Sequence, residues 1–215
     1  MPVTSLPNRP TRQDAPARPP EPARGPVAAY AYGAALAWLL GAVVPAVYRG
    51  DAHLAQQRLS EAHGHLSLVL FALALAARPL ARRWAWPLRN RRALGVLAFL
   101  YAAAHTWYAF GTTLGGSLET LEFLAPATRD GIVAGLASLL LMLPLFLTSN
   151  DLSQRLLRRN WGRLHRLLVA PALLLAVLHT VLIGVHYGLQ PFVPASAALV
   201  AAVAALVLFR NRRSR

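Results

Sequence analysis

The sequence predicts an all-α, polytopic membrane protein, and three observations support this fold class. Hydrophobic residues make up 56% of the 215-residue chain, and its mean hydropathy of +0.42 is too high for an ordinary soluble domain. Apolar segments long enough to span a bilayer alternate with short polar segments. The basic residues, all of them arginine, gather beside those apolar segments. We therefore predict a bundle of six transmembrane helices.

The predicted domain organisation follows from composition. Residues 1–26 are rich in proline and arginine and are expected to be a disordered cytoplasmic tail. Residues 27–210 form the six-helix domain, and residues 211–215 form a basic cytoplasmic tail. No internal repeat is evident, and residues 49–63 are predicted to be a mixed-charge loop. The six predicted spans are residues 28–48, 64–80, 93–113, 132–148, 161–187 and 192–209.

The distribution of arginine predicts the orientation of the chain. Of the 22 arginines, 19 lie in the two tails and in the loops after the second and fourth spans. The other three, Arg49, Arg58 and Arg129, lie in the loops on the opposite side. Because basic loops stay in the cytoplasm, both termini are predicted to be cytoplasmic. The arginines that give the net charge of +14 are therefore expected to set the topology and to face anionic lipid headgroups. No nucleic-acid partner is predicted.

Composition also limits the cofactors. Cysteine is absent, which excludes disulfides, thiolate metal sites, iron–sulfur clusters and covalently attached haem. The sequence has neither a GxGxxG motif nor a P-loop. We therefore expect flavin or nicotinamide chemistry, if it is needed, to come from a partner protein.

Two histidines are predicted to lie at matched depth on different helices. His105 is the thirteenth residue of the third span, and His179 is the thirteenth residue of the fifth when counted from Leu167. Both should lie about 18 Å above the cytoplasmic edge of the membrane. A histidine inside the membrane is costly and is a functional candidate by default. Two facing imidazoles suit the iron of a b-type haem, whereas the alternative is a pair of hydrogen-bonded histidines in a helix bundle.

A second haem position is predicted near the cytoplasmic edge. His165 precedes His179 by fourteen residues, which is about 21 Å along the helix and about 40° around it. Its counterpart on the third span is Arg91, followed by Arg92, and neither is a usual iron ligand. The inner haem is therefore five-coordinate, differently ligated or missing. Arg91 and Arg92 are candidate partners for haem propionates, because guanidinium binds carboxylate in a bidentate manner.

The remaining histidines are weaker candidates. His63 and His65 are two residues apart and point to different helix faces, so at most one of them faces a shared cofactor. His65 is the better candidate for cofactor binding, and an interfacial histidine in contact with water is the alternative. His186 is expected at the outer interface, near a quinone or a partner protein. His53 is expected to be a solvated loop residue.

Several segments, in this order and spacing, resemble the ferric-reductase-like transmembrane domain family. The resemblance covers about residues 60–187 and is closest to the short bacterial form, the haem-binding membrane subunits of periplasmic methionine sulfoxide reductase systems. It implies b-type haem between the third and fifth spans, with His105 and His179 as ligands and His165 as a further haem histidine. The segments that carry it are GHLSLVLFALALAARPL (Gly64–Leu80), RRALG (Arg91–Gly95) before His105, LPLFLTSN (Leu143–Asn150) and WGRLHRL (Trp161–Leu167) before His179.

The predicted function is electron transfer across the bacterial inner membrane by one or two b haems. The electron donor would be a cytoplasmic flavoprotein, such as a flavin reductase with FMN, or membrane quinol. The acceptor would be a periplasmic reductase subunit or ferric iron. Whether the chain is itself an enzyme stays open. The alternative is a transporter or a structural subunit. Against it, no Asp, Glu or Arg lies in the middle of a predicted span, where histidines are the only ionisable groups.

Overall fold

A computed structural model describes residues 26–186 of the chain, together with residues 198 and 201. Throughout this part the regular structure is helical, and no strand occurs in it. The elements are α1 (Pro26–Val47), α2 (Ala52–Leu80), α3 (Trp86–Arg89), α4 (Arg91–Thr112), the 3₁₀ helix η1 (Leu118–Phe123), α5 (Pro126–Leu147), α6 (Asp151–Leu157) and α7 (Arg159–His186).

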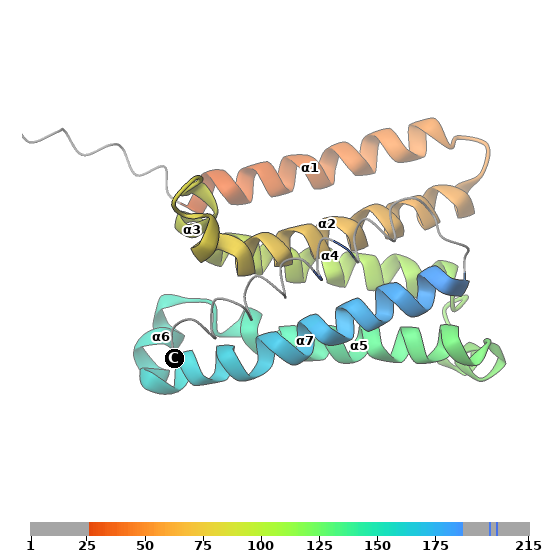
Figure 1. Cartoon of the computed structure of the whole chain (residues 1–215). Helices are drawn as coiled ribbons and strands as arrows, with labels where there is room; N and C mark the ends of the chain where they lie inside the picture. The colour runs from red at the N-terminus through yellow and green to blue at the C-terminus, as the bar shows by residue number, and fades with distance from the viewer. Residues whose placement is uncertain (1–25, 187–197, 199–200, 202–215) are drawn as a thin grey trace, which may run out of the picture.

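Five of these helices, α1, α2, α4, α5 and α7, are long and apolar enough to cross a membrane. They run alongside one another, and the short helices α3 and α6 lie at the same end of the bundle (Figure 1). The prediction of an all-helical, multi-pass membrane protein is therefore confirmed for the described residues. The predicted sixth span (192–209) and the tails at 1–26 and 211–215 fall almost wholly outside them, so the count of six stays a prediction.

The prediction of a loop over residues 49–63 is wrong for most of its length. Helix α2 begins at Ala52, and the Asp51 side chain caps it by accepting a hydrogen bond from the Leu54 backbone N–H at 2.9 Å. The segment buries Ala55 and Leu59 on one face and keeps its charged residues on another, which is a helical pattern. At 29 residues α2 is about 43 Å long, so its polar first turns extend beyond the hydrocarbon core.

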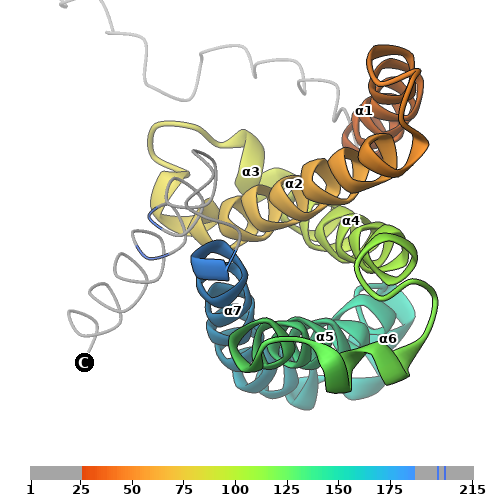
Figure 2. The same cartoon turned by 90° about the vertical axis from the view of Figure 1, so that its right-hand side faces the viewer.

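The bundle is built from two helix pairs. Helix α2 packs along α4, and α5 packs along α7, as the end-on view shows (Figure 2). Ala98 of α4 and Ala172 of α7 are fully buried, and such small residues allow membrane helices to approach closely. The shared core joins all four helices and consists of Leu68, Phe71, Ala98, Met142, Ala172 and Leu173.

Candidate functional site

The two histidines predicted to share a membrane depth lie next to each other. His105 on α4 and His179 on α7 have ring centroids 5.8 Å apart, and their ring planes are inclined at 72°. Both side chains are half-buried. A metal held by two imidazole nitrogens at about 2 Å each would place the ring centroids about 6 Å apart. The spacing therefore fits one metal between the two rings, while their role as iron ligands stays a prediction.

Each of these imidazoles is anchored through its Nδ1 atom to a backbone carbonyl of the companion helix. Nδ1 of His105 donates to the carbonyl of Ser60 on α2 at 2.9 Å. Nδ1 of His179 donates to the carbonyl of Gly131 on α5 at 2.8 Å. Because a carbonyl only accepts, both Nδ1 atoms carry the proton, and Nε2 keeps its lone pair. This tautomer, with Nδ1 bonded to a carbonyl, is the one that metal-ligating histidines use.

Within the described residues, no group of three or more His, Asp and Glu side chains is placed to hold a metal ion. A bare metal ion would therefore have only the two imidazoles as protein ligands here, fewer than the three or four of usual metal sites. An iron porphyrin needs only axial ligands from the protein, since the macrocycle supplies the remaining nitrogens. Two anchored imidazoles with available Nε2 atoms thus fit a haem better than a free cation.

A glycine of the companion helix lies under each imidazole. A Cβ atom added to Gly64 of α2 would lie 3.0 Å from Nδ1 of His105. A Cβ atom added to Gly135 of α5 would lie 2.7 Å from Nδ1 of His179. The rings therefore occupy the space that a side chain at either position would fill.

The two helix pairs repeat the same pattern of contacts. In both pairs the carbonyl acceptor comes four residues before the glycine, and a buried serine comes three residues after it. Ser67 donates to the carbonyl of Ala98, and Ser138 donates to the carbonyl of Ala172, each at 2.8 Å. Each of these alanines precedes the site histidine by seven residues.

The expectation that the chain has no internal repeat is thereby corrected at the level of structure. The signal in the sequence is short: G-x-x-S occurs at residues 64–67 and 135–138. It is accompanied by an alanine seven residues before His105 and before His179. These few shared positions are too short a pattern to be recognised as a repeat from the sequence alone. The repeat becomes visible only through the contacts that the residues make in the structure.

The inner position differs from the outer one. Nε2 of His165 lies 3.1 Å from the Thr148 hydroxyl, and the Trp161 ring packs on the imidazole with centroids 4.1 Å apart. Trp161 in turn donates through Nε1 to the carbonyl of Thr148 at 2.8 Å. The nitrogen that is available for a metal in the outer pair is thus hydrogen-bonded to a hydroxyl here.

The two arginines predicted near the inner position have different surroundings. Arg91 donates through Nε to the carbonyl of Ala74 on α2 at 3.0 Å, and it interacts electrostatically with His165. Arg92 forms an ion pair with Asp151, which connects the start of α4 to the start of α6. The hydrogen bond and the charge of Arg92 lower the pKa of the Asp151 carboxyl. Arg91 is therefore tied to α2 at an exposed position, whereas Arg92 is half-buried and paired with Asp151 of α6.

His63 and His65 point to different surroundings, as their spacing predicts. His63 is buried, donates from Nδ1 to the carbonyl of Leu59 at 2.7 Å, and packs between the rings of Tyr101 and Tyr108. This environment is that of a packing residue. His65 lies 2.7 Å from the carbonyl of Glu61 through its own Nδ1.

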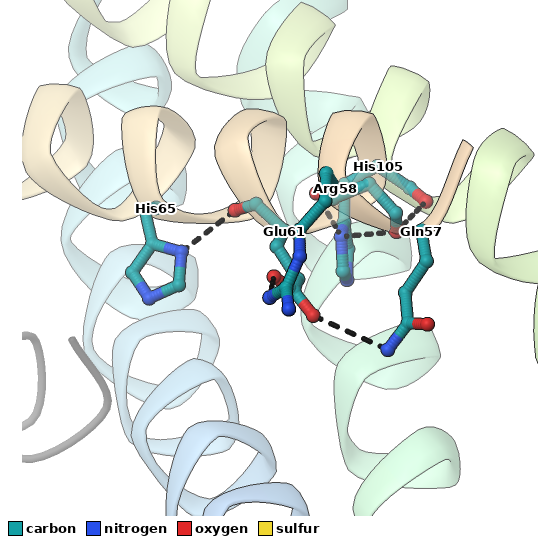
Figure 3. A network of polar contacts seen from close by, with 6 residues as sticks. Gln57, Arg58, Glu61, His65 and His105 are labelled. Carbon is teal, nitrogen blue, oxygen red and sulfur yellow. Dashed lines mark hydrogen bonds and ion pairs between the residues drawn. The ribbon is translucent and has the colours of Figure 1, made fainter. Parts of the chain in front are cut away.

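A polar network on α2 lies beside the outer pair, and the sequence analysis missed it. The Arg58–Glu61 ion pair and Gln57 project from the same side of α2 as His65, with His105 close behind (Figure 3). Of the other two histidines, His53 is exposed in the first turn of α2. His186 is the last residue of α7, and its place near a quinone or a partner protein stays a prediction.

Comparison with known proteins identifies the family. The family model for the ferric reductase like transmembrane component matches residues 62–177. The protein-methionine-sulfoxide reductase heme-binding subunit MsrQ of Rhodospirillum rubrum is 36% identical over 156 residues, which are 70% of this chain and 74% of that protein. The proteins of the same name from Xanthomonas axonopodis pv. citri and Deinococcus radiodurans are 41% and 42% identical.

The last two alignments cover 53% and 52% of this chain, and the chain spans 51% and 55% of the length of those relatives. No solved structure matches the chain. The family match includes both pairs α2–α4 and α5–α7 almost to the position of His179. The chain therefore belongs to the ferric reductase like transmembrane family, on the branch of the MsrQ-type membrane subunits.

Proposed function

We propose that this protein is a b-type haem membrane subunit that carries electrons across the bacterial inner membrane. The observation that supports this most directly is the pair of imidazoles, 5.8 Å apart, whose Nδ1 atoms are both tied to backbone carbonyls. The names of the relatives, each a heme-binding subunit of a methionine sulfoxide reductase, support the same cofactor. A bound haem would supply one-electron chemistry in an apolar setting.

The residues of this chain would hold and orient that group. His105 and His179 would be its axial ligands, with the carbonyls of Ser60 and Gly131 fixing the tautomer and the ring orientation. His165 would be the sole protein ligand at a second, weaker inner site, with Arg91 beside a propionate. The count is therefore one firmly held haem and one labile haem, and His65 stays a candidate at the rim of the outer site.

The topology proposed for this function has six spans in residues 27–210 and cytoplasmic tails at 1–26 and 211–215. Electrons would enter from a cytoplasmic flavoprotein that carries flavin, or from quinol. They would leave to the catalytic subunit of a periplasmic methionine sulfoxide reductase, or to ferric iron. The arginine-rich ends of the helices, around α3 and α6, suit an acidic cytoplasmic donor.

Reconstituted vesicles test this proposal. Purified protein in liposomes with ferricyanide trapped inside receives a membrane-impermeant reductant outside, and the loss of internal ferricyanide absorbance is followed. We expect reduction that depends on the haem-loaded protein and is absent from liposomes prepared with His105→Ala. A colourless protein from haem-replete cells, with no internal reduction, would instead favour a transporter or a structural subunit.

A further inference from the structure

The two glycines under the site histidines have a geometric role that the proposed function does not assign. In an α-helix each Cα–Cβ bond tilts toward the N-terminus, so a side chain covers the turn before it. The side chain at a given position therefore shields the carbonyl four residues earlier. Gly64 and Gly135 stand four residues after Ser60 and Gly131, whose carbonyls accept the Nδ1 protons.

From this arrangement we infer that Gly64 and Gly135 are positioning residues for the haem ligands. By lacking a side chain, each leaves a backbone carbonyl of the companion helix open to the imidazole of the neighbouring helix. The carbonyl then fixes Nδ1 as the protonated nitrogen and directs Nε2 toward the metal. This inference deepens the proposed function and rests on it, because it assigns a role toward the same cofactor.

The two positions differ in how tightly the ring fits. At Gly135 an added Cβ would lie 2.7 Å from Nδ1 and 3.1 Å from both Cε1 and Cγ of His179, so the imidazole or the helix would have to shift. At Gly64 the corresponding nearest contact is 3.0 Å, to Nδ1 of His105, and a small displacement relieves it. Alanine at Gly135 should therefore disturb the site more than alanine at Gly64.

The expected effect has a defined sign. A hydrogen bond from Nδ1 to a carbonyl makes the imidazole a more basic ligand, which favours the ferric state. Loss of this bond should therefore raise the midpoint potential of the outer haem. Loss of an outer-shell partner of this kind typically weakens metal affinity by about 10–100-fold. We expect Gly135→Ala to lie in that range and Gly64→Ala to change the haem in the same direction but less.

Two other glycines provide matched controls. Gly33 of α1 is equally crowded, since an added Cβ would lie 2.5 Å from Cδ2 of Leu97, but it faces the end of a flexible side chain instead of an imidazole. Gly111 of α4 has no atom within 4 Å of such a Cβ. Gly33→Ala measures the effect of crowding between two helices at a place away from the histidines. Gly111→Ala measures the effect of replacing a helical glycine by alanine where no neighbouring atom is crowded.

The experiment compares the haem-loaded wild type with the four alanine variants in detergent. The readouts are the low-spin EPR signal, the midpoint potential from a spectroelectrochemical titration, and haem retention against apomyoglobin as a competing acceptor. Support is a raised potential and faster haem loss in Gly135→Ala, a smaller change in Gly64→Ala, and wild-type values in both controls. If Gly135→Ala does not accumulate in membranes, Gly64→Ala alone decides.

Two results would overturn the inference. One is wild-type potential and retention in each of the site variants that accumulates. The other is a change in Gly33→Ala as large as that in Gly135→Ala, which would reduce the effect to helix crowding. Either result leaves the proposed function intact as long as the wild type is haem-loaded. A wild type that binds no haem would refute the proposed function itself.

Discussion

Arg91 occupies in α4 the position that His165 occupies in α7. Arg91 lies seven residues before Ala98, and His165 lies seven residues before Ala172. The carbonyls of these two buried alanines accept the hydrogen bonds of Ser67 and Ser138. The repeat that places His105 opposite His179 therefore has an arginine, instead of a second histidine, at the position equivalent to His165. An inner pair of imidazoles is missing because one of its two positions is arginine.

Arg91→His should restore that pair. The substitution places a second imidazole opposite His165, at the position equivalent to it in the repeat. We expect the ratio of firmly bound haem to protein to rise from about one toward two, with a second low-spin signal. Arg91→Gln, which removes the charge without providing a ligand, is the matched control. Pyridine haemochrome assays measure the ratio of haem to protein in both variants. An equal ratio in Arg91→His and Arg91→Gln would contradict the assignment of the inner site.

Removal of His165 should affect only the labile haem. In a gentle detergent the wild type should carry more than one haem per chain, and His165→Ala should carry about one. The low-spin signal of the outer site should be unchanged, because His105 and His179 are anchored independently of His165. A wild-type ratio fixed at one and unaffected by the substitution would make His165 a packing residue beside Trp161 and Thr148.

The juxtaposition of His105 and His179 could be predicted because depth in a membrane helix is a matter of counting residues. The anchors could not, since Ser60 and Gly131 contribute backbone carbonyls, which have no signature in a sequence. Gly64 and Gly135 were equally hidden, because a glycine shows its function only when its neighbour is known. The start of α2 at Ala52 was missed because the prediction followed hydrophobicity, whereas the first turns of this helix are polar.

The Arg92–Asp151 ion pair should make stability depend on pH. Arg92 lowers the pKa of Asp151, so the pair stabilises the fold above the unfolded pKa of about 3.9 and is lost as pH falls through the lower folded pKa. We expect Asp151→Asn to unfold at a lower temperature than the wild type at pH 7, with a smaller difference in high salt. The difference should vanish in acid below the folded pKa.

Asp130→Asn is the control for this pair, because within the described part of the chain Asp130 pairs with its sequence neighbour Arg129, at 3.5 Å, and connects no two helices. Its unfolding temperature should match that of the wild type across the same pH range. An unfolding temperature of Asp151→Asn equal to that of the wild type at pH 7 and low salt would contradict the contribution assigned to the pair.

The two buried serine bonds should contribute similarly, because they occupy equivalent positions in the repeat. Ser67→Ala and Ser138→Ala each remove a hydroxyl that donates to a fully buried carbonyl. We expect each to lower the free energy of unfolding by about 1 kcal/mol, as interhelical hydrogen bonds in membranes do. Ser149→Ala, which removes a local bond from a residue just after α5 back to the carbonyl of Leu145, should cost less. Unfolding in mixed micelles measures all three, and costs that differ severalfold between Ser67 and Ser138 would contradict their equivalence.

The proposed topology predicts on which side of the membrane a reporter fused to each loop will lie. Fusions at Gly50 and Gly116 should read periplasmic, and fusions at Asn90 and Gln154 should read cytoplasmic. The physical reason is the arginine bias of the loops, which should retain α3 and α6 on the cytoplasmic side. Paired alkaline phosphatase and green fluorescent protein fusions measure this, and an inverted pattern at either pair of sites would refute the orientation.

The central claim is that His105 and His179 bind one haem iron between them. Its most direct test is the visible and EPR spectrum of purified wild type, His105→Ala and His179→Ala. We predict a six-coordinate, low-spin b-type spectrum for the wild type, with sharp α and β bands after dithionite reduction. Each alanine variant should lose most of the haem or convert it to a five-coordinate, high-spin form. A wild-type low-spin spectrum retained in both variants would contradict the claim.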